Sequence, residues 1–473
     1  MRYLLTILLL GSLAYGQAAR SDSVAQTTRF TAGGSHFSGS PIVSSGSTSN
    51  NQTVPGTMYL CAANGYKYVD VANTCGWSGT DIGSWINSAY AAITSNGGTI
   101  IVNTTGGANF STPIRMMTSG KFARIVCTDQ NSALNYIPTS GTAITLNPSS
   151  AIYVGWGLEN CNFVGPGSGT STTGLSVGGS NGAIGAEIDH NRILNFGTGI
   201  TFGSNAFLDN FFHNFVANNG KDLNIPAGLT GTGESIVFDA TTFAQTASYV
   251  PNCVTVDIGA APNILFANGS FDNCQYEQSG GGTSVSMEGM HFENPAQPGT
   301  NPFIIMSGGS LSLVSPDFGA TNSGRVPVPT SFISESGGRL SMNNGRVLNL
   351  SSNAIGQVVA LTRTAEFHES GTRNDSGSAI TSLWSYGGTG CASASGNTFA
   401  LNKSIACGPF RITVVPAIGN IGSLPGCSSS LEGTRAVAND CNAWCSVGGT
   451  CTGGGSTHCE VYCNGASYFE TGR

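Results

Sequence analysis

Four polar residues of this sequence flank hydrophobic positions that recur along the chain, and their side chains suit acid–base chemistry. His213, Asp272 and Glu293 each follow a recurring aromatic residue, and His291 precedes one. Side chains alternate between the two faces of a strand, so the neighbours of an inward aromatic residue point outward. Carboxylates and imidazoles in one outward row can exchange protons with a bound substrate. We therefore predict that Asp272, Glu293 and His291 are catalytic and that His213 belongs to the same row.

Further charged residues lie close to these positions in the sequence. Arg192 stands beside Asp189 and His190, and we predict it as the base if the reaction is proton abstraction next to bound calcium. The competing interpretation is structural. In it the acids are surface residues that keep the protein soluble, and Arg192 forms a surface ion pair. The predicted substrate-binding residues are Asp189, His190, Asp209, His213, Glu277 and Glu288.

The recurring positions predict the element that must hold these residues. Ile193, Phe212, Phe271 and Phe292 are each followed two residues later by Asn, with spacings of 19 (193 to 212) and 21 (271 to 292) residues. Looser copies surround Phe163, Phe318 and Val347. We interpret each apolar residue as inward and each Asn as a left-handed turn residue. A period of this length predicts parallel coils stacked into a solenoid.

Two local elements precede the repeats. Residues 59–77 predict a hairpin around an Asn-Gly turn, which Cys61 and Cys75 could close. Residues 81–93 have apolar side chains at helical spacing, with Asp81 as the N-cap and Gly97 as the stop signal. An apolar strand follows directly at 99–104.

The composition agrees with turn-rich β structure. The chain of 473 residues has only 18 Lys+Arg and 25 Asp+Glu, but 67 Gly, and 40% of it is hydrophobic. Disorder driven by high charge is excluded, because enough apolar surface exists for a large core. The net charge of −7 leaves few cations to contact a phosphate backbone, so no nucleic-acid partner is expected.

The termini predict export and a modular layout. Residues 1–19 have the charged start, short apolar run and small residues of a signal peptide, so we expect a secreted, extracellular or periplasmic protein without stable membrane insertion. We divide the rest into a flexible Ser/Gly/Thr-rich segment (20–57), a β-helix domain (58–375), a connecting segment (376–420) and a Cys-rich C-terminal module (421–473).

The 14 cysteines suit an oxidising compartment. Cys253 and Cys274 are 21 residues apart, about one coil, so they are predicted to bond between coils or to remain buried thiols. In the C-terminal module disulfides are favoured over zinc, because its cysteines form no Cys-x-x-Cys pair. The disulfide candidates are Cys61, Cys75, Cys253, Cys274, Cys391, Cys407, Cys427 and Cys463.

Two segments resemble known families. The helix at 81–93, the glycines Gly97 and Gly98 and the strand after them resemble the entry of right-handed parallel β-helix proteins of the pectate lyase superfamily and of tailspike-like proteins. This resemblance implies an all-β right-handed solenoid whose open end the helix caps. Residues 424–469 resemble a short C-terminal module of phage tail and exported bacterial proteins. Cys427 and Cys463 match its two cysteines, whereas the four cysteines between them depart from it.

These observations leave three functional classes open. The first is a pectate lyase-like polysaccharide lyase or hydrolase, with calcium needed only by a lyase. The Asn-Thr-Asp, Asp-Asp, Gly-His-Gly and Arg-Ile-Lys motifs of polygalacturonase-like hydrolases are absent, so that family's mechanism is not supported. The second class is a non-catalytic glycan-binding or adhesion protein, and the third is a tailspike-like receptor-binding protein. All three predict an extracellular polysaccharide as the partner.

Overall fold

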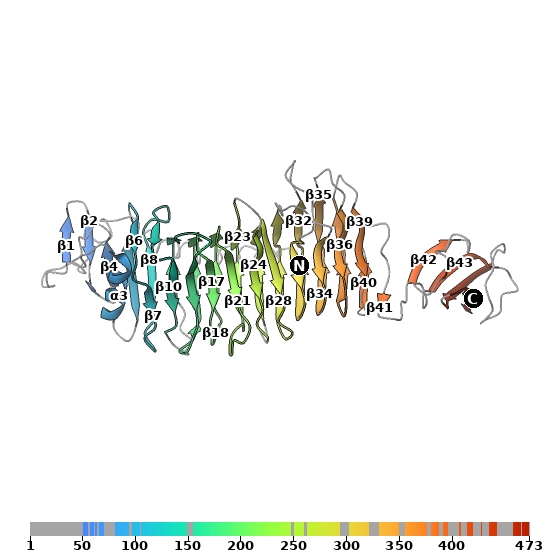
Figure 1. Ribbon diagram of the computed structural model, residues 1–473, viewed down its shortest axis with the longest axis horizontal. Coiled ribbons are helices and arrows are strands. Elements are labelled where there is room, and N and C mark those ends of the chain that lie inside the picture. The colour runs from blue at the N-terminus through green and yellow to red at the C-terminus, as the bar shows by residue number, and fades with distance from the viewer. Residues whose placement is uncertain are drawn as a thin grey trace, which may run out of the picture.

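The computed structural model is a parallel β-helix in which each coil contributes one strand to each of three sheets (Figure 1). The predicted all-β solenoid is therefore confirmed. The structure describes residues 51–54, 57–60, 62–63, 66–70, 81–93, 97–104, 106–148, 155–246, 250–259, 263–293, 302–320, 331–349, 355–375, 380–386, 391–395, 406–407, 414–419, 427, 435–441, 457–464 and 466–472. The predicted signal peptide and the predicted partners Cys61 and Cys75 lie outside these residues.

Within the described residues, sheet 1 has 15 strands. In chain order they are β3 (Ala62–Ala63), β4 (Tyr66–Asp70), β5 (Gly98–Asn103), β8 (Ala123–Cys127), β11 (Trp156–Glu159), β15 (Ala186–Asp189), β19 (Asn210–Phe212), β22 (Ile236–Asp239), β25 (Ile264–Ala267), β28 (Ser284–Glu288), β31 (Ser310–Val314), β34 (Arg339–Asn343), β37 (Glu366–Ser370), β40 (Cys391–Ser395) and β41 (Ala406–Cys407).

Sheet 2, which follows sheet 1 in each coil, has 11 strands in the described part of the chain. They are β6 (Ala108–Phe110), β9 (Leu134–Tyr136), β12 (Asn162–Val164), β16 (Arg192–Leu194), β20 (Phe215–Ala217), β23 (Thr242–Ala244), β26 (Ser270–Asp272), β29 (His291–Glu293), β32 (Asp317–Ala320), β35 (Arg346–Asn349) and β38 (Arg373–Asn374).

Sheet 3 completes each coil and has 11 strands among the residues described. They are β7 (Ile114–Met116), β10 (Ser140–Leu146), β13 (Ser171–Val177), β17 (Thr198–Phe202), β21 (Lys221–Ile225), β24 (Val250–Val256), β27 (Cys274–Gln278), β30 (Ile304–Met306), β33 (Ser331–Glu335), β36 (Ile355–Leu361) and β39 (Ile380–Tyr386).

Three smaller sheets lie outside this helix. Strands β1 (Asn51–Val54) and β2 (Thr57–Leu60) form an antiparallel pair, and β14 (Ala183–Ile184) pairs with β18 (Ala206–Phe207). The C-terminal strands β42 (Val414–Gly419), β43 (Arg435–Cys441), β44 (Thr457–Cys463) and β45 (Tyr468–Gly472) form a separate four-stranded sheet.

The predicted capping helix is present as α3 (Ile82–Ala92). The Asp81 side chain accepts from the backbone N–H groups of Gly83 and Ser84, as predicted for an N-cap. Its other oxygen accepts hydrogen bonds from Ser111 and Thr112. These bonds stabilise the carboxylate, so the pKa of Asp81 is lowered although burial opposes that shift. The helix ends before Gly97, the predicted stop, whose φ of +84° instead serves the turn into β5.

Aromatic side chains stack from coil to coil inside the helix. In sheet 2, Phe243, Phe271, Phe292 and Phe318 follow one another with ring centroids 5.5, 5.3 and 4.7 Å apart. The predicted inward positions of Ile193, Phe271 and Phe292 are confirmed. The prediction for Phe212 is wrong, because Phe211 is the buried residue of β19 and belongs to sheet 1. A shift of one residue turns a side chain to the other face.

The turns explain the recurring asparagines. Asn195 and Asn273 adopt φ of 60° and 53° after sheet 2 strands, as predicted. Asn214 differs, since it lies in the turn from sheet 1 to sheet 2 and its side chain is buried. Its Oδ1 accepts from the backbone N of Asn191 at 3.0 Å, and its Nδ2 donates to the carbonyl of Ile188 at 2.7 Å. Asn294, the fourth predicted turn residue, lies outside the described residues.

Replacing Asn214 with Ala is expected to destabilise the protein by about 1–3 kcal/mol, because it leaves buried backbone groups of Asn191 and Ile188 without partners. Denaturant unfolding of both proteins measures the change. Asn210→Ala is the matched control, because its side chain donates a long hydrogen bond of 3.4 Å to the carbonyl of Leu208. Equal destabilisation by the two substitutions would contradict the role given to Asn214.

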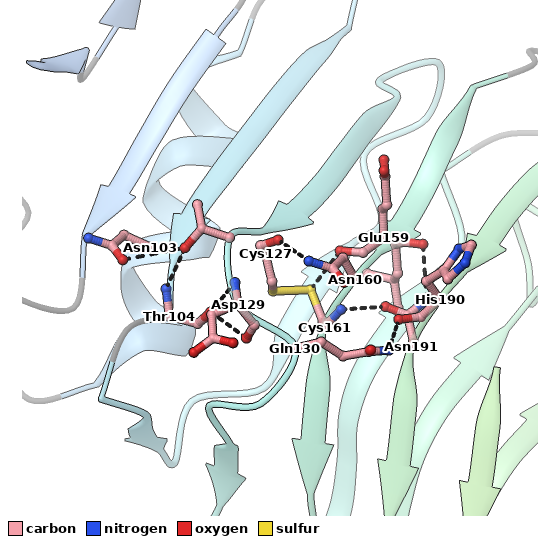
Figure 2. Close-up of a disulfide and its surroundings, with 12 residues drawn as sticks. Asn103, Thr104, Cys127, Asp129, Gln130, Glu159, Asn160, Cys161, His190 and Asn191 are labelled. Carbon is pink, nitrogen blue, oxygen red and sulfur yellow. Dashed lines mark hydrogen bonds between the residues drawn. A yellow bond between two sulfur atoms is a disulfide. The ribbon is translucent and has the colours of Figure 1, made fainter. Parts of the chain in front are cut away.

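Disulfides join neighbouring coils. Cys253 and Cys274, which were predicted to bond between coils or to remain thiols, form a disulfide. In the C-terminal region the predicted disulfide candidates Cys427 and Cys463 are bonded to each other. Sequence reasoning missed Cys127–Cys161, which links β8 to the turn after β11 (Figure 2). Cys391 and Cys407 are register partners in the antiparallel pair of β40 and β41. The confirmed pairs agree with the predicted preference for disulfides over zinc at those positions.

Candidate functional site

The outer face of sheet 2 brings three of the four predicted catalytic residues together. Asp272 ends β26 and Glu293 ends β29, and the two are register partners on adjacent strands. His291 begins β29 and pairs in register with Ser270 on one side and Asp317 on the other. The central Phe271 and Phe292 are buried, so the residues that flank them point outward. We call Asp272, His291, Glu293 and Asp317 the acidic patch.

His291 bridges the acids of this patch. Its Nε2 lies 3.5 Å from Oε2 of Glu293, and its Nδ1 lies 3.2 Å from Oδ2 of Asp317. The same Asp317 oxygen is 3.4 Å from Nη1 of Arg346, which also contacts Asp375 through Nε at 3.1 Å. The imidazole therefore has a carboxylate on each side, which fixes the orientation of its ring.

The surroundings of Asp272 favour its protonated form. Burial raises its pKa, and the negative charge of Glu293 on the next strand raises it further. His291 opposes the shift, but it remains upward. The Oδ1 atom of Asp272 is buried and has no hydrogen-bond partner among the described residues. Asp272 is therefore the member of the pair best suited to keep a proton and deliver it to a substrate.

Arg192 lies on the same face but not in the acidic patch. It begins β16, and strands β20 and β23 separate it from β26. Its guanidinium carbon stands 5.6 Å from the ring centroid of Phe215 in the next strand. Arg192 therefore does not share one site with Asp272 and Glu293, and its role as a base beside Asp189 and His190 stays a prediction.

The predicted substrate-binding residues are distributed over different faces. Asp189, His190 and His213 gather at the turns from sheet 1 to sheet 2. Glu277 lies on sheet 3, and the exposed Glu288 ends a strand of sheet 1. The single outward row predicted for His213 with the acidic patch is therefore wrong, because one coil bends through three sheets between repeats.

Asp209 is also misplaced as a substrate-binding residue. It is fully buried, and its Oδ1 accepts a hydrogen bond from the backbone N of Ala186 at 2.8 Å. Burial raises the pKa of Asp209 well above its usual value, so a neutral carboxyl is favoured. In this structure Asp209 supports the turn before β15 and does not reach the surface.

Sequence reasoning missed Asp317 and Arg346. Both precede buried residues of sheet 2, Phe318 and Val347, which were among the looser copies of the repeat. Both residues could have been predicted by also taking the residue that precedes the inward position in each of the looser copies. Register places His291, Asp317, Arg346 and Arg373 in one outward column.

Calcium, which a lyase would need, does not fit the acidic patch. Ca²⁺ takes six to eight oxygen ligands. Here the imidazole of His291 lies between the carboxylates of Glu293 and Asp317, and it offers nitrogen instead of oxygen. We therefore derive no step through a calcium ion at this position.

A less charged track leads along sheet 2 to the acidic patch. In register order the track holds the partly exposed Val164 and Leu194 and then the buried Ala217 and Ala244, and Asp272 follows them. At the far end, a surface hollow of about 560 Å³ is lined by Asn109, Asn131, Ser132 and Asn135. Asn135 donates to Asn109 at 3.1 Å, and both stand in the register column that contains Asp272 and Glu293.

Comparisons with known proteins find only weak structural likeness. No family model matches the sequence, and no curated protein matches it. A solved structure of the ORF18 protein of Geobacillus virus E2 is 13% identical with a TM-score of 0.45, covering 85% of this chain and 75% of that one.

Two tailspike proteins of bacteriophage CBA120 also show structural likeness. The enzymatically active domain of tailspike protein 4 is 17% identical with a TM-score of 0.40, over 89% of this chain and 57% of that one. Tailspike protein 3 is 11% identical with a TM-score of 0.36, over 85% and 68%. Likenesses this low carry no argument about family or function.

The described residues contain no helix that is long and apolar enough to cross a membrane.

Proposed function

We propose that this protein binds an extracellular polysaccharide along the outer face of sheet 2 and hydrolyses it between Asp272 and Glu293. The observation that carries the proposal is the register pairing of these two carboxylates, one of which has a raised pKa. Two carboxyl groups in different protonation states are what glycoside hydrolysis needs. The disulfides between coils support a location in an oxidising compartment outside the cytoplasm.

The two acids take different roles. Protonated Asp272 gives its proton to the glycosidic oxygen as the bond to the anomeric carbon breaks. Glu293 attacks that carbon, and water then releases the sugar from Glu293 while Asp272 accepts the water's proton. The backbones of neighbouring strands are about 4.8 Å apart, so two register-paired carboxyl groups can take up the ~5–5.5 Å separation of retaining enzymes. The proposal therefore predicts hydrolysis with retention of the anomeric configuration.

The track supports a polymeric substrate. Strands β6 and β29 are seven strand spacings apart in sheet 2, or roughly 34 Å at about 4.8 Å per spacing. The partly exposed Val164 and Leu194 offer an apolar surface to sugar rings, and the amides of Asn109 and Asn135 can hydrogen-bond their hydroxyls. With so few cations along the track, a neutral polysaccharide fits better than a strongly acidic one.

Hydrolysis is favoured over lyase chemistry. A pectate lyase-like reaction needs a basic side chain beside the acids and calcium to hold the substrate. Arg192 is several strands away, and Arg346 already contacts Asp317 and Asp375. The carboxylate pair needs neither of them.

The experiment is digestion of a panel of neutral and acidic polysaccharides by the purified chain, with and without a calcium chelator. We expect new reducing ends from a neutral polymer, no unsaturated ends, and no effect of the chelator. Unsaturated ends that disappear with the chelator would show lyase chemistry and contradict the proposed mechanism. Retained binding without any cleavage would contradict hydrolysis and favour an adhesion protein or a tailspike-like receptor-binding protein.

A further inference from the structure

Two histidines on consecutive turns share one carboxylate. His190 follows β15 and His213 follows β19, and these strands are neighbours in sheet 1. The two imidazole rings stack with centroids 4.6 Å apart and planes 23° from parallel. The Nδ1 atom of His190 lies 2.7 Å from Oδ1 of Asp189, and the Nδ1 atom of His213 lies 3.6 Å from the same oxygen. Two ring nitrogens therefore converge on one point.

The backbone at these positions does not require histidine. His190 and His213 have φ of 52° and 51°, and Asn160 and Asn268 occupy the same turn position on other coils with φ of 57° and 54°. Asparagine tolerates this left-handed region well. Because the fold accepts Asn at this position, the conformation of the turn does not explain why histidine stands at both places.

The cluster is accessible and has room to adjust. The histidine side chains are each 54% exposed and the Asp189 side chain is 26% exposed. Figure 2 shows the ring of His190 directed away from the Cys127–Cys161 disulfide. One ligand atom from each of Asp189, His190 and His213 lies within 4.8 Å of the other two. The backbone on both sides is held by the strand ladder, so the three residues are presented together.

We propose that Asp189, His190 and His213 bind a divalent transition-metal ion, for which Zn²⁺ is the probe. Imidazole nitrogens and a carboxylate oxygen are ligands that zinc accepts at about 2.0–2.2 Å, with a tetrahedral arrangement that leaves one position for water. Such ligands are roughly 3.4 Å apart around the ion, so the exposed rings need to move by about an ångström. Calcium and magnesium are disfavoured, since both prefer oxygen ligands.

This site is distinct from the acidic patch of the proposed hydrolase. The turn of His213 leads into β20, and β23 lies between β20 and β26, which carries Asp272. The inference therefore does not depend on the proposed reaction. It also needs no cysteine, so the disulfides can remain intact.

The experiment is calorimetric titration of the full chain with Zn²⁺, comparing wild type with the His190→Asn and His213→Asn variants. Asn is chosen because Asn160 and Asn268 already occupy this turn position, which keeps the backbone conformation. We expect each variant to lose one bound Zn²⁺ per chain relative to wild type. The matched control is His368→Asn, which replaces a half-buried histidine of β37 and should keep the full stoichiometry.

Thermal unfolding gives a second readout. Zn²⁺ should raise the melting temperature of wild type and of His368→Asn by more than it raises that of either turn variant, because binding to the folded state adds stability. Zinc bound elsewhere in the chain would remain in all variants and cancels in the comparison. Unchanged stoichiometry in both turn variants, with melting temperatures near wild type without metal, would overturn the proposal.

Discussion

Replacing Glu335 with Gln is expected to stabilise the protein by about 5 kcal/mol at pH 8 and by almost nothing near pH 4.5. Glu335 ends β33 and stands in register between the buried residues Met306 and Leu361. It is fully buried, and its carboxyl oxygens have no well-aligned hydrogen bond among the described residues, although the backbone N–H groups of Glu366 and Leu340 oppose the rise of its pKa. Burial, with a smaller contribution from the charge of Glu366, raises the pKa of Glu335 to about 9.

The sign of the pH dependence follows from proton binding. The folded protein keeps the Glu335 proton up to a pKa of about 9, whereas the unfolded chain releases it near the ordinary value of 4.5. Stability from this group is therefore fully present below pH 4.5 and is lost as the pH rises toward 9. At about 1.36 kcal/mol per pKa unit, the loss is roughly 6 kcal/mol over the whole range. Gln cannot ionise, so the variant lacks this loss.

Unfolding by denaturant between pH 4 and pH 9 measures the difference between the two proteins. All other titrating groups are present in both proteins, so subtracting one profile of unfolding free energy against pH from the other leaves the contribution of Glu335. Glu288→Gln is the matched control, because Glu288 is exposed and should leave the profile as in wild type. Parallel profiles for wild type and Glu335→Gln would show that the carboxyl ionises in the folded protein at its ordinary pH.

The second large effect concerns the acid pair. Asp272→Asn and Glu293→Gln are each expected to lower polysaccharide cleavage by about 10³-fold, within the range that positioned acids and bases contribute. Both substitutions keep the size of the side chain and remove either the transferable proton or the nucleophilic charge. Substrate binding should change little, because the track along sheet 2 remains intact.

Two measurements distinguish this role from a structural one. Because the reaction needs protonated Asp272, wild-type activity should fall as the pH rises through the elevated pKa of that residue. In Glu293→Gln, the pKa of Asp272 should fall, since the neighbouring charge that raises it is gone, and carboxyl titration followed by NMR would detect this. Glu187→Gln, on sheet 1 in contact with Arg124, is the control that should retain activity. Activity within a few fold of wild type in both pair variants would refute the assignment.

Part of the site was predictable from local patterns. Phe271 and Phe292 were recognised as inward residues, so Asp272, His291 and Glu293 were correctly placed on one outward face. Their strands belong to consecutive coils, and over a single coil the spacing of the repeat correctly predicts which residues face inward. The cross-coil pair Cys253–Cys274 was predictable for the same reason.

Other parts were not predictable because they depend on where the chain bends. Phe212 was assigned to the wrong sheet by its spacing, and His213 was therefore moved from the turn beside His190 to the face of the acidic patch. The burial of Asp209 and Glu335 was also invisible, since a charged residue in a short strand gives no local sign of which side it faces. Cys127–Cys161 was missed because 34 residues separate the two cysteines, more than the repeat period.

The sequence by itself determined the class of the fold. Glycine- and asparagine-rich turns, few charges and apolar residues at intervals of about one coil are compatible with stacked parallel strands, and the helix at Ile82–Ala92 with its Asp81 cap was readable from local periodicity. Only the tertiary structure decided which acids meet. Register between strands from different coils pairs Asp272 with Glu293 and His190 with His213, and that register is set by core packing and turn geometry across the whole coil.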